Sequence, residues 1–314
     1  MLWGTLVHLG TNMWRDIDNF KGAGKKTYED AGSSSMRLDK KLWDEYMIKL
    51  SESGCNTIVM DVGDGIVYKS HPEIAIDGSW SREEITAELE KLHKMGFEVI
   101  PKLNFSTTHD VWLKEYSKMV STDTYYKVCK DLIDEVCEIF KPRFVHIGMD
   151  EEVYENQKDY TYVVIRQNDL WWHDLYYLVE CVEKNGARAM MWSDYARNNP
   201  EEFIEKCPKS VVQCVWYYFD KFGENLDPVC ECRVRAFDNL DKAGFDIFAG
   251  GSIEYFDDNM KLLTQYCAKN LSKEHMFGFI QTTWEAVEEK WRDALWRGID
   301  TLKDSKEWYE SEVH

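Results

Sequence analysis

The order of apolar and amphipathic segments along the chain constrains its fold more than any other feature. Short apolar runs of strand length cover residues 5–9, 57–61, 98–102, 144–148, 188–192, 211–216, 246–249 and 277–282. Longer segments with helical periodicity cover residues 40–53, 82–95, 124–140, 170–185, 200–206, 234–243, 260–269 and 290–302. Because a strand followed by a helix recurs eight times, the pattern predicts an α/β fold, a single (β/α)8 TIM barrel.

The connections between these segments indicate one domain with an elaborated face. No Pro-rich or Ser-rich linker, repeat or low-complexity tract divides residues 1–314, and single barrels routinely reach this length. The longer connections cover residues 14–37, 62–80, 103–120 and 153–167, mainly after the first four strands. Such connections lie at the C-terminal ends of barrel strands, so we expect extended loops over one side of that face.

The composition restricts the partners that the protein is expected to bind and the compartment in which it is expected to lie. The formal net charge of −19 disfavours nucleic acid and anionic membranes as partners, because both would be repelled. The chain has no apolar run of about 18 residues, and its first residues do not resemble a signal peptide, so we expect no membrane association. The nine cysteines are scattered and odd in number, which indicates reduced thiols and a cytoplasmic location. Cys230 and Cys232 are too close for the usual zinc spacing, so we expect no metal there.

The predicted strand over residues 144–148 runs into three consecutive carboxylates, Asp150, Glu151 and Glu152. Like charges at one strand end repel each other, so the cluster is either solvated or needed by a site. In a barrel of alternating strands and helices, active sites are built at the C-terminal strand ends. These acids are therefore candidate site residues, with a solvated acidic loop as the alternative interpretation.

Tryptophans and acids recur at the later strand ends. These positions carry Trp192, Asp194, Trp216, Tyr255, Asp257, Trp284 and Glu285. A single Trp at such a place usually fills a core. Three at one face together with carboxylates suit a sugar, whose C–H faces stack on rings while its hydroxyls need acceptors. The set predicts a carbohydrate site, with an oligosaccharide or glycoconjugate as the substrate.

The fourth strand and its extension also carry a family resemblance. The run His146-Ile147-Gly148-Met149-Asp150-Glu151 resembles the His-x-Gly-x-Asp-Glu signature of glycoside hydrolase family 20, the β-N-acetylhexosaminidases. The resemblance continues in order along residues 4–285 and includes Tyr255-Phe256-Asp257 after the seventh strand. It implies a retaining, exo-acting enzyme that releases terminal N-acetylglucosamine or N-acetylgalactosamine. The substrate's own 2-acetamido group would participate, and no cofactor would be needed.

The resemblance implies roles for individual residues. Glu151 would protonate the leaving oxygen and then deprotonate the incoming water. Asp150 would orient the acetamido N–H and stabilise the oxazolinium-like intermediate, and Tyr255 would donate to the acetamido carbonyl. Trp192, Trp216 and Trp284 would surround the acetamido methyl, and Asp257 and Glu285 would accept hydrogen bonds from the outer hydroxyls. Asp194 would be a further substrate-binding acid. The supporting residues would be Asp64, His109 and His146, with Asp64 and His109 forming a relay behind Glu151.

Three segments depart from the family's pattern. The Arg that usually ends the first strand has no counterpart in register, and Arg15 is the nearest one. The second-strand His-x-x-Asp pattern keeps its acid, Asp64, but has Asp61 in place of the His. The third-strand Pro-Gly-His turn becomes Thr107-Thr108-His109. These departures leave open which terminal sugar, or which decorated form of it, the site accepts.

Three other functions remain open at this point. The barrel could hydrolyse a β-glycoside without an acetamido group, or it could bind carbohydrate without turnover. His8, Asp61, Asp64 and His109 could instead hold a metal ion in a hydrolase, although no His-x-His spacing occurs. Preference for a substrate without an acetamido group would support the first alternative, and binding without hydrolysis would support the second. Loss of activity with a chelator would support the third.

Overall fold

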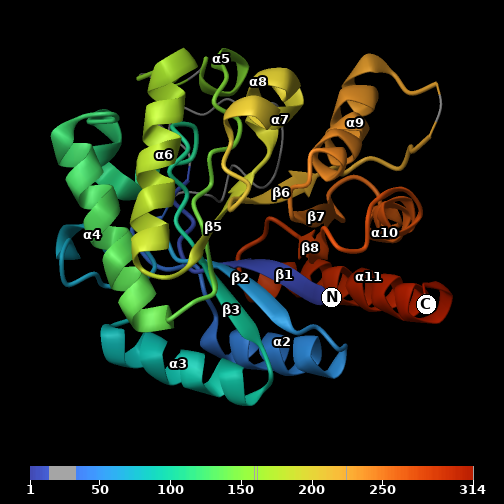
Figure 1. Cartoon of the computed structure of the whole chain (residues 1–314). Helices are drawn as coiled ribbons and strands as arrows, with labels where there is room; N and C mark the ends of the chain where they lie inside the picture. Colours follow the sequence, from blue (N-terminus) through green and yellow to red (C-terminus); the bar gives the residue numbers. More distant parts are fainter. Residues whose placement is uncertain (14–32, 159, 161, 224, 314) are drawn as a thin grey trace.

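Eight parallel strands close into a barrel in the computed structural model, which describes residues 1–13, 33–158, 160, 162–223 and 225–313. The strands are β1 (Leu2–His8), β2 (Thr57–Asp61), β3 (Glu98–Lys102), β4 (Phe144–His146), β5 (Arg188–Trp192), β6 (Val212–Trp216), β7 (Ile247–Ser252) and β8 (Met276–Thr282). Each strand pairs with its neighbours in sequence, and β1 pairs with β8. The closed parallel barrel in Figure 1 confirms the predicted α/β fold.

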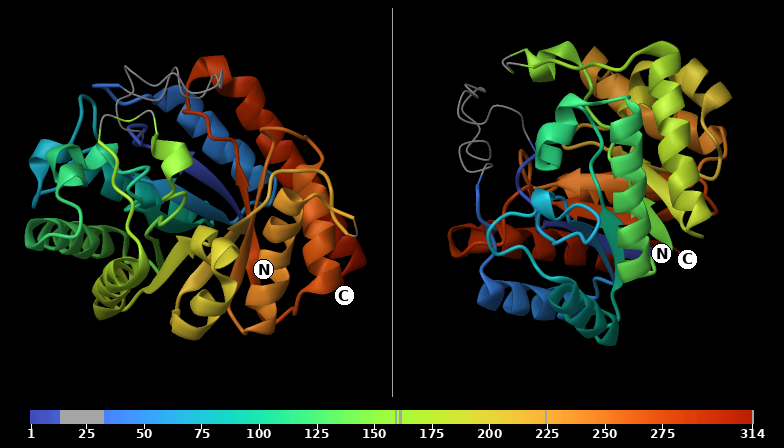
Figure 2. Two further views of the ribbon diagram at one scale, coloured as in Figure 1. Left: turned by 90° about the horizontal axis from the view of Figure 1, so that it is seen from above. Right: turned by 90° about the vertical axis from the view of Figure 1, so that its left-hand side faces the viewer.

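Helices follow the strands and surround them, as both views in Figure 2 show. The longer helices are α2 (Lys40–Glu52), α3 (Arg82–Lys94), α4 (Asp123–Phe140), α6 (Asn168–Lys184), α8 (Pro200–Lys206), α9 (Pro228–Lys242), α10 (Asn259–Asn270) and α11 (Arg292–Glu312). Short helices within the connections are η2 (Pro72–Ile74), η3 (Val111–Lys118), α5 (Tyr154–Gln157), α7 (Asp194–Asn198) and η4 (Glu289–Trp291). Polar caps fix several starts: Asp39 accepts from two first-turn amides of α2, and Ser81 and Glu84 form a capping box on α3.

Two apolar layers stabilise the barrel. Side chains alternate between the faces of a strand, so one set points into the barrel and the other packs outward against the helices. The interior set is buried and comprises Leu6, Val59, Ile100, Phe144, Met190, Trp192, Val212, Cys214, Phe248 and Ile280. The larger outer layer joins strands to helices and contains bulky side chains such as Trp43 of α2 and Phe237 of α9. Together these layers hold the strand ends, and whatever they carry, in fixed positions.

Polar side chains continue the interior layer at the C-terminal ends of the first four strands. His8, Asp61, Lys102 and His146 each lie two residues beyond an interior apolar residue, so they share its inward direction. All four are buried, and Lys102, with an exposed fraction of 0%, forms an ion pair with Asp61. His8 Nδ1 lies 3.6 Å from the same carboxylate. A charged network therefore occupies the barrel interior just before the strands end.

Several element boundaries differ from the prediction. β4 ends at His146 rather than at residue 148, because the φ of +77° at Gly148 lies outside the sheet conformation. α9 begins at Pro228 rather than at residue 234, because Asp227 caps it and a proline suits the first helical turn. α11 continues to Glu312 rather than ending at residue 302.

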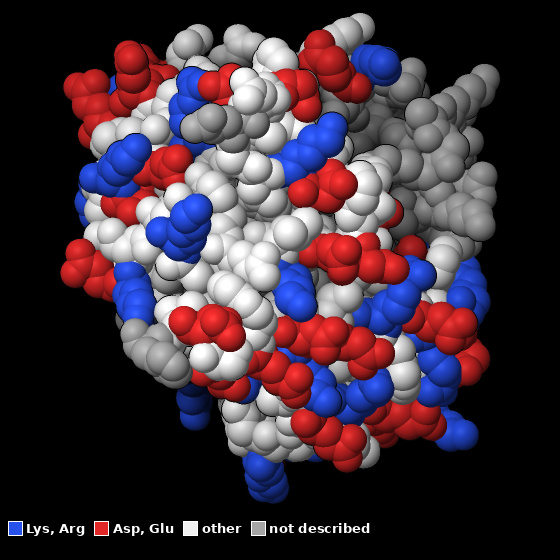
Figure 3. Space-filling model, turned by 90° about the vertical axis from the view of Figure 1, so that its right-hand side faces the viewer, with Lys and Arg blue, Asp and Glu red and all other residues white. Residues whose placement is uncertain are grey.

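The surface carries charges of both signs. On the face shown in Figure 3, acidic and basic side chains are interspersed, and no continuous basic patch is visible there. Among the described residues, no helix combines the length and apolar character needed to cross a membrane. None of the nine cysteines is in a disulfide, and all are buried except Cys232 on α9.

Candidate active site

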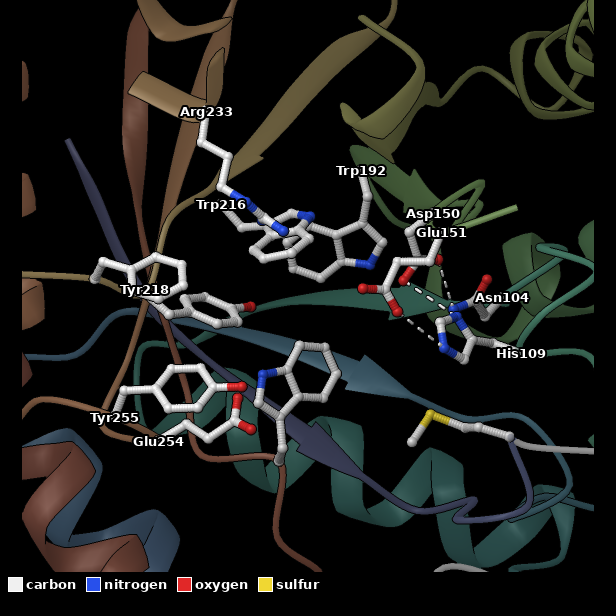
Figure 4. A pocket seen from close by; sticks show the side chains of 13 residues that line it. Asn104, His109, Asp150, Glu151, Trp192, Trp216, Tyr218, Arg233, Glu254 and Tyr255 are labelled. Atoms are coloured by element: carbon white, nitrogen blue, oxygen red, sulfur yellow. Dashed lines mark hydrogen bonds and ion pairs between the residues drawn. The ribbon is translucent and has the colours of Figure 1, made fainter. Parts of the chain in front are cut away.

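The C-terminal strand ends enclose a cavity of about 240 Å³ (Figure 4). Its walls come from the connections after nearly every strand and from α9. The lining residues are Met13, Asn104, His109, Asp150, Glu151, Trp192, Trp216, Tyr218, Phe219, Arg233, Glu254, Tyr255 and Trp284. Pockets for drug-sized ligands usually span roughly 300–1,000 Å³, so this cavity suits a ligand of about one sugar ring.

A turn with left-handed backbone follows β4 and carries the two adjacent acids. Gly148, Met149 and Glu151 have φ values of +77°, +71° and +57°. Such values are costly for residues other than glycine and tend to occur at functional sites. Position 148 requires glycine, because a Cβ there would lie 1.9 Å from Asn104 Oδ1. The turn brings both Asp150 and Glu151 to the cavity wall (Figure 4).

Asp150 is held in its ionised form. Asn104 Nδ2 donates to Asp150 Oδ1 over 3.1 Å, and His109 Nδ1 lies 3.2 Å from Oδ2. Burial alone would raise the pKa of Asp150, but the charge and hydrogen bond of His109 and the charge of Lys102 outweigh it. The pKa of Asp150 therefore lies well below its ordinary value, and the carboxylate carries a negative charge at any working pH.

Glu151 has the opposite tendency. Burial raises its pKa from 4.5 to about 7, and the nearby charges of Asp194 and Asp150 add to the rise, while His109 opposes it. His109 Nε2 lies 3.6 Å from Glu151 Oε2. Of these two neighbouring carboxyl groups, one thus has a pKa far below neutrality and the other a pKa near neutrality, the arrangement expected of an acid paired with a fixed anion.

His109 joins the two acids and does not form the expected relay with Asp64. The carboxylates nearest to its ring nitrogens are those of Asp150 and Glu151. Asp64 is buried and accepts a hydrogen bond of 2.6 Å from Asn12 Nδ2, and it does not line the cavity. The pKa of His109 is raised despite its burial, because Asp150 and Glu151 both favour its charged form. His109 therefore lies between the two acids, which both favour its protonated form.

Two tryptophans form an aromatic floor beside Asp150. Trp192 is buried, and its ring centroid lies 6.2 Å from that of Trp284 and 4.8 Å from that of His146. Burial lowers the pKa of His146 to about 3, so this imidazole is neutral and supports Trp192. Trp284 also packs against His8 of the interior network at 5.7 Å. The floor can receive an apolar group of a ligand next to the Asp150 carboxylate.

Trp216 forms another wall, but arginines cover part of its ring. Its Nε1 donates to Asp194 Oδ2 over 2.9 Å. Arg233 and Arg197 lie over the ring at 4.1 and 5.4 Å from its centroid. Arg197 Nη2 is also 3.1 Å from Asp194 Oδ1, so Asp194 holds this wall together and does not line the sugar-sized cavity.

Comparison with known proteins identifies the family. The model of the glycosyl hydrolase family 20 catalytic domain matches residues 72–228, which is half of the chain and includes Asp150 and Glu151. The chain belongs to glycoside hydrolase family 20. No curated protein sequence matches it significantly.

Solved structures of family 20 proteins share the fold at low sequence identity. The Flavobacterium johnsoniae chitobiase superposes with a TM-score of 0.66 at 16% identity, over 96% of this chain and 48% of its own. The β-N-acetylhexosaminidase from Bacteroides fragilis gives 0.61 at 14% identity, over 98% of this chain and 70% of its own. A Vibrio harveyi exo-β-N-acetylglucosaminidase gives a TM-score of 0.63 at 14% identity, over 96% of this chain and 54% of its own. The chain therefore spans about half the length of two of these relatives.

Within the family 20 barrel, the residues expected after β7 and β8 are only partly brought to the cavity. Tyr255 and Trp284 line it, whereas Asp257 and Glu285 do not. The Asp257 side chain is 66% exposed and lies 3.8 Å from Arg297 Nε. Glu254 takes the place of Asp257 in the wall (Figure 4), because the chain turns between these positions. Arg15 lies outside the described residues.

Several lining residues of this family 20 site were assigned no role from the sequence, although Asn104, Tyr218 and Glu254 lie at predicted strand ends. They are Met13, Asn104, Tyr218, Phe219, Arg233 and Glu254. Tyr218 could have been found, since it follows Trp216 by two residues and alternation places both on one face. The Tyr218 side chain is buried and points into the cavity, whereas Tyr255 is 46% exposed at its edge (Figure 4). Arg233 comes from the middle of α9, where no strand-end rule applies.

The residues considered for a metal do not converge. His8 and Asp61 belong to the interior network with Lys102, while His109 faces Asp150 in the cavity wall. Within the described part of the chain, no three His, Cys, Asp or Glu side chains lie close enough together to hold a metal ion.

Proposed function

We propose that this family 20 barrel is a retaining exo-β-N-acetylhexosaminidase that releases terminal N-acetylglucosamine or N-acetylgalactosamine with the help of the substrate's acetamido group. The observation that carries the proposal is the pair of adjacent acids with opposite protonation. Asp150 is held ionised, while the pKa of Glu151 is raised to about 7. The two groups meet at His109, in a cavity with an aromatic floor.

In the first step Glu151 supplies a proton and Asp150 supplies a charge. The acetamido oxygen attacks the anomeric carbon, the glycosidic bond breaks, and the Glu151 proton passes to the leaving oxygen. The oxazolinium-like intermediate carries a positive charge near the acetamido nitrogen, whose N–H donates a hydrogen bond to the Asp150 carboxylate. The enzyme itself needs no nucleophile.

In the second step Glu151 reverses its role. The ionised Glu151 removes a proton from a water molecule, whose oxygen attacks the anomeric carbon and opens the intermediate. The water enters on the side that the leaving group vacated, so two inversions give retention. His109, 3.6 Å from Glu151, lowers the pKa of this carboxyl and so favours the ionised form that this step needs.

The cavity fits the acetamido group of a single terminal sugar. Trp192 and Trp284 offer apolar surface for its methyl. Tyr218, with its hydroxyl in the cavity, is a donor for the acetamido carbonyl alongside the expected Tyr255. Glu254 is an acceptor for an outer hydroxyl. A related structure supports the ligand class, since the Vibrio harveyi exo-β-N-acetylglucosaminidase was solved with N-acetylglucosamine.

Paired substrates test the proposal. Two aryl β-glycosides that differ only in a 2-acetamido or a 2-hydroxyl group are hydrolysed with and without a thiazoline that mimics the oxazolinium. We expect cleavage of the acetamido sugar alone and inhibition by the thiazoline. Cleavage of the 2-hydroxyl sugar without inhibition would assign the barrel to another β-glycoside. Tight binding of the acetamido sugar without any cleavage would make it a binding protein.

A further inference from the structure

Two neighbouring cavities meet at Glu151 and Arg233, which line both. The first is the sugar-sized cavity, and the second, of about 340 Å³, lies between the connections that follow β4 and β5. If Glu151 protonates the glycosidic oxygen, as proposed above, the terminal sugar occupies the first cavity on one side of it. Arg233 then lies close to the scissile bond, within reach of the sugar or of the leaving group.

Arg233 differs from the other arginines in these walls. Arg166 is buried and forms an ion pair with Glu152. Arg197 lies 3.1 Å from Asp194. The Nε and Nη1 atoms of Arg233 are buried, and no hydrogen-bond partner for them is found in the structure. Among the described residues, no carboxylate lies within ion-pair distance of Arg233, so it is the unpaired cation of this wall.

Stacking fixes the position of Arg233 without satisfying its N–H groups. The guanidinium carbon lies 4.1 Å from the ring centroid of Trp216, a cation–π contact that uses the face of the guanidinium. The N–H groups project from the edge of the guanidinium, and those of Nε and Nη1 have no partner in the structure. In Figure 4 the side chain reaches from α9 into the cavity above Trp216.

Arg233 is only partly buried, but leaving its buried Nε and Nη1 donors unpaired is costly, whereas hydrogen bonds from a guanidinium to an oxyanion are strong and can form in pairs. The acids closest by are already engaged, since Asp194 contacts Arg197 and Trp216, and Glu151 faces His109. We propose that Arg233 binds an oxyanion group, a sulfate ester or a carboxylate, that the substrate itself carries. The inference rests on the proposed function for the place of the substrate and adds a charged determinant to its specificity.

Two positions on the substrate could supply this group. A sulfate on a hydroxyl of the terminal sugar would reach Arg233 from the first cavity. A carboxylate or sulfate on the leaving group would reach it past Glu151, from the side of the second cavity. The chemistry at Arg233 is the same in both cases, and substrates charged at one position or the other separate them.

The test compares neutral and charged substrates on matched variants. The substrates are an aryl 2-acetamido-2-deoxy-β-glucoside, its 3-, 4- and 6-O-sulfates, and the same neutral sugar on an aryl group with a carboxylate. The variants are Arg233→Gln, Arg233→Lys and, as control, Arg235→Gln. Arg235 lies on the same helix but is exposed and paired with Glu231, so its loss tests for a general effect of removing one positive charge.

We expect wild-type kcat/KM for at least one charged substrate to exceed that for the neutral one by about tenfold or more. Arg233→Gln should abolish this preference, Arg233→Lys should keep part of it, and Arg235→Gln should leave it intact. Preference for a sulfated sugar places the oxyanion on the terminal residue, and preference for the charged aryl group places it on the leaving group. Equal losses on neutral and charged substrates in Arg233→Gln, or no charged substrate preferred by the wild type, would overturn the inference.

Binding distinguishes a failure of this inference from a failure of the proposed function. Calorimetry measures the affinity of the wild type and of Arg233→Gln for N-acetylglucosamine and for its 6-sulfate, without turnover. If nothing is hydrolysed but the sulfated sugar binds more tightly through Arg233, the result supports the oxyanion site and refutes the proposed activity. If the neutral acetamido substrate is cleaved and no charged form is cleaved faster or bound more tightly, the result supports the proposed activity and refutes the oxyanion site.

Discussion

The raised pKa of Glu151 predicts how the rate depends on pH and on the leaving group. A general acid must be protonated, so kcat/KM should fall as the pH rises through about 7 and should approach a tenfold loss per pH unit. At pH 8 a group with this pKa is protonated in about one molecule in eleven, against about one in three thousand for an ordinary glutamic acid. The environment of Glu151 therefore raises the protonated fraction of this carboxyl at pH 8 about 300-fold, and a smaller factor in rate follows because a group with a higher pKa is a weaker acid.

Replacing Glu151 with Gln isolates this contribution. The amide cannot donate a proton to the leaving oxygen, so substrates with alkyl leaving groups should lose about 10²- to 10⁴-fold in kcat/KM. Substrates with a nitrophenolate leaving group need little protonation and should lose far less. The alkaline fall above pH 7 should disappear together with the carboxyl group. Glu183→Gln, at an exposed glutamate on α6 that lines neither cavity, is the matched control.

The assay is a series of pH–rate profiles for the wild type and both variants, each with an alkyl and a nitrophenyl substrate. An alkaline limb centred near pH 4.5 would mean that Glu151 is not desolvated as described. Equal losses on both leaving groups in Glu151→Gln would refute a general-acid role.

Three further predictions concern the surroundings of this acid. Asp150→Asn should reduce hydrolysis of acetamido substrates by roughly 10²- to 10³-fold and weaken thiazoline binding. Because the Asp150 charge helps to raise the pKa of Glu151, the alkaline limb of the pH–rate profile should also move to lower pH. An unchanged rate would exclude participation of the acetamido group. Lys102→Met should lower the free energy of unfolding in urea by about 3–5 kcal/mol, since Asp61 would be left buried without its partner, and adding Asp61→Asn should recover much of the loss. Gly148→Ala should lower the free energy of unfolding by about 1–3 kcal/mol because of the left-handed backbone alone, and it should displace Asn104 from Asp150. A variant with unchanged stability and rate would contradict the described turn.

The sequence was sufficient to predict the barrel because hydrophobic periodicity records which face of each element is buried. Every predicted strand overlaps an observed one, and neighbouring strands in the barrel follow one another in the sequence. The predicted and observed boundaries differ where a local backbone conformation decides them. Gly148 ends β4 by adopting a positive φ, and Asp227 starts α9 early by capping it. Such features depend on single residues that hydrophobic periodicity does not record.

Site residues could be predicted at strand ends but not within the connections. Asp150, Glu151 and Trp192 lie where a strand delivers them, so alternation and strand order suffice. After β7, two acids lie three residues apart in a loop, and only the path of that loop decides that Glu254 rather than Asp257 reaches the cavity. Arg233 was missed for another reason: it reaches the site from a helix, through the packing of α9 against β6.

The cysteines offer a practical route to watching ligands arrive. Burial raises the pKa of most of the buried thiols, Cys55 and Cys207 for example to about 12, which makes them poor nucleophiles. Cys232 is the one exposed thiol, and it precedes Arg233 on α9. A thiol-reactive fluorophore should therefore attach at a single position without any mutagenesis. Its emission would report on the helix that carries Arg233, so ligand entry could be timed by stopped flow in the wild-type chain.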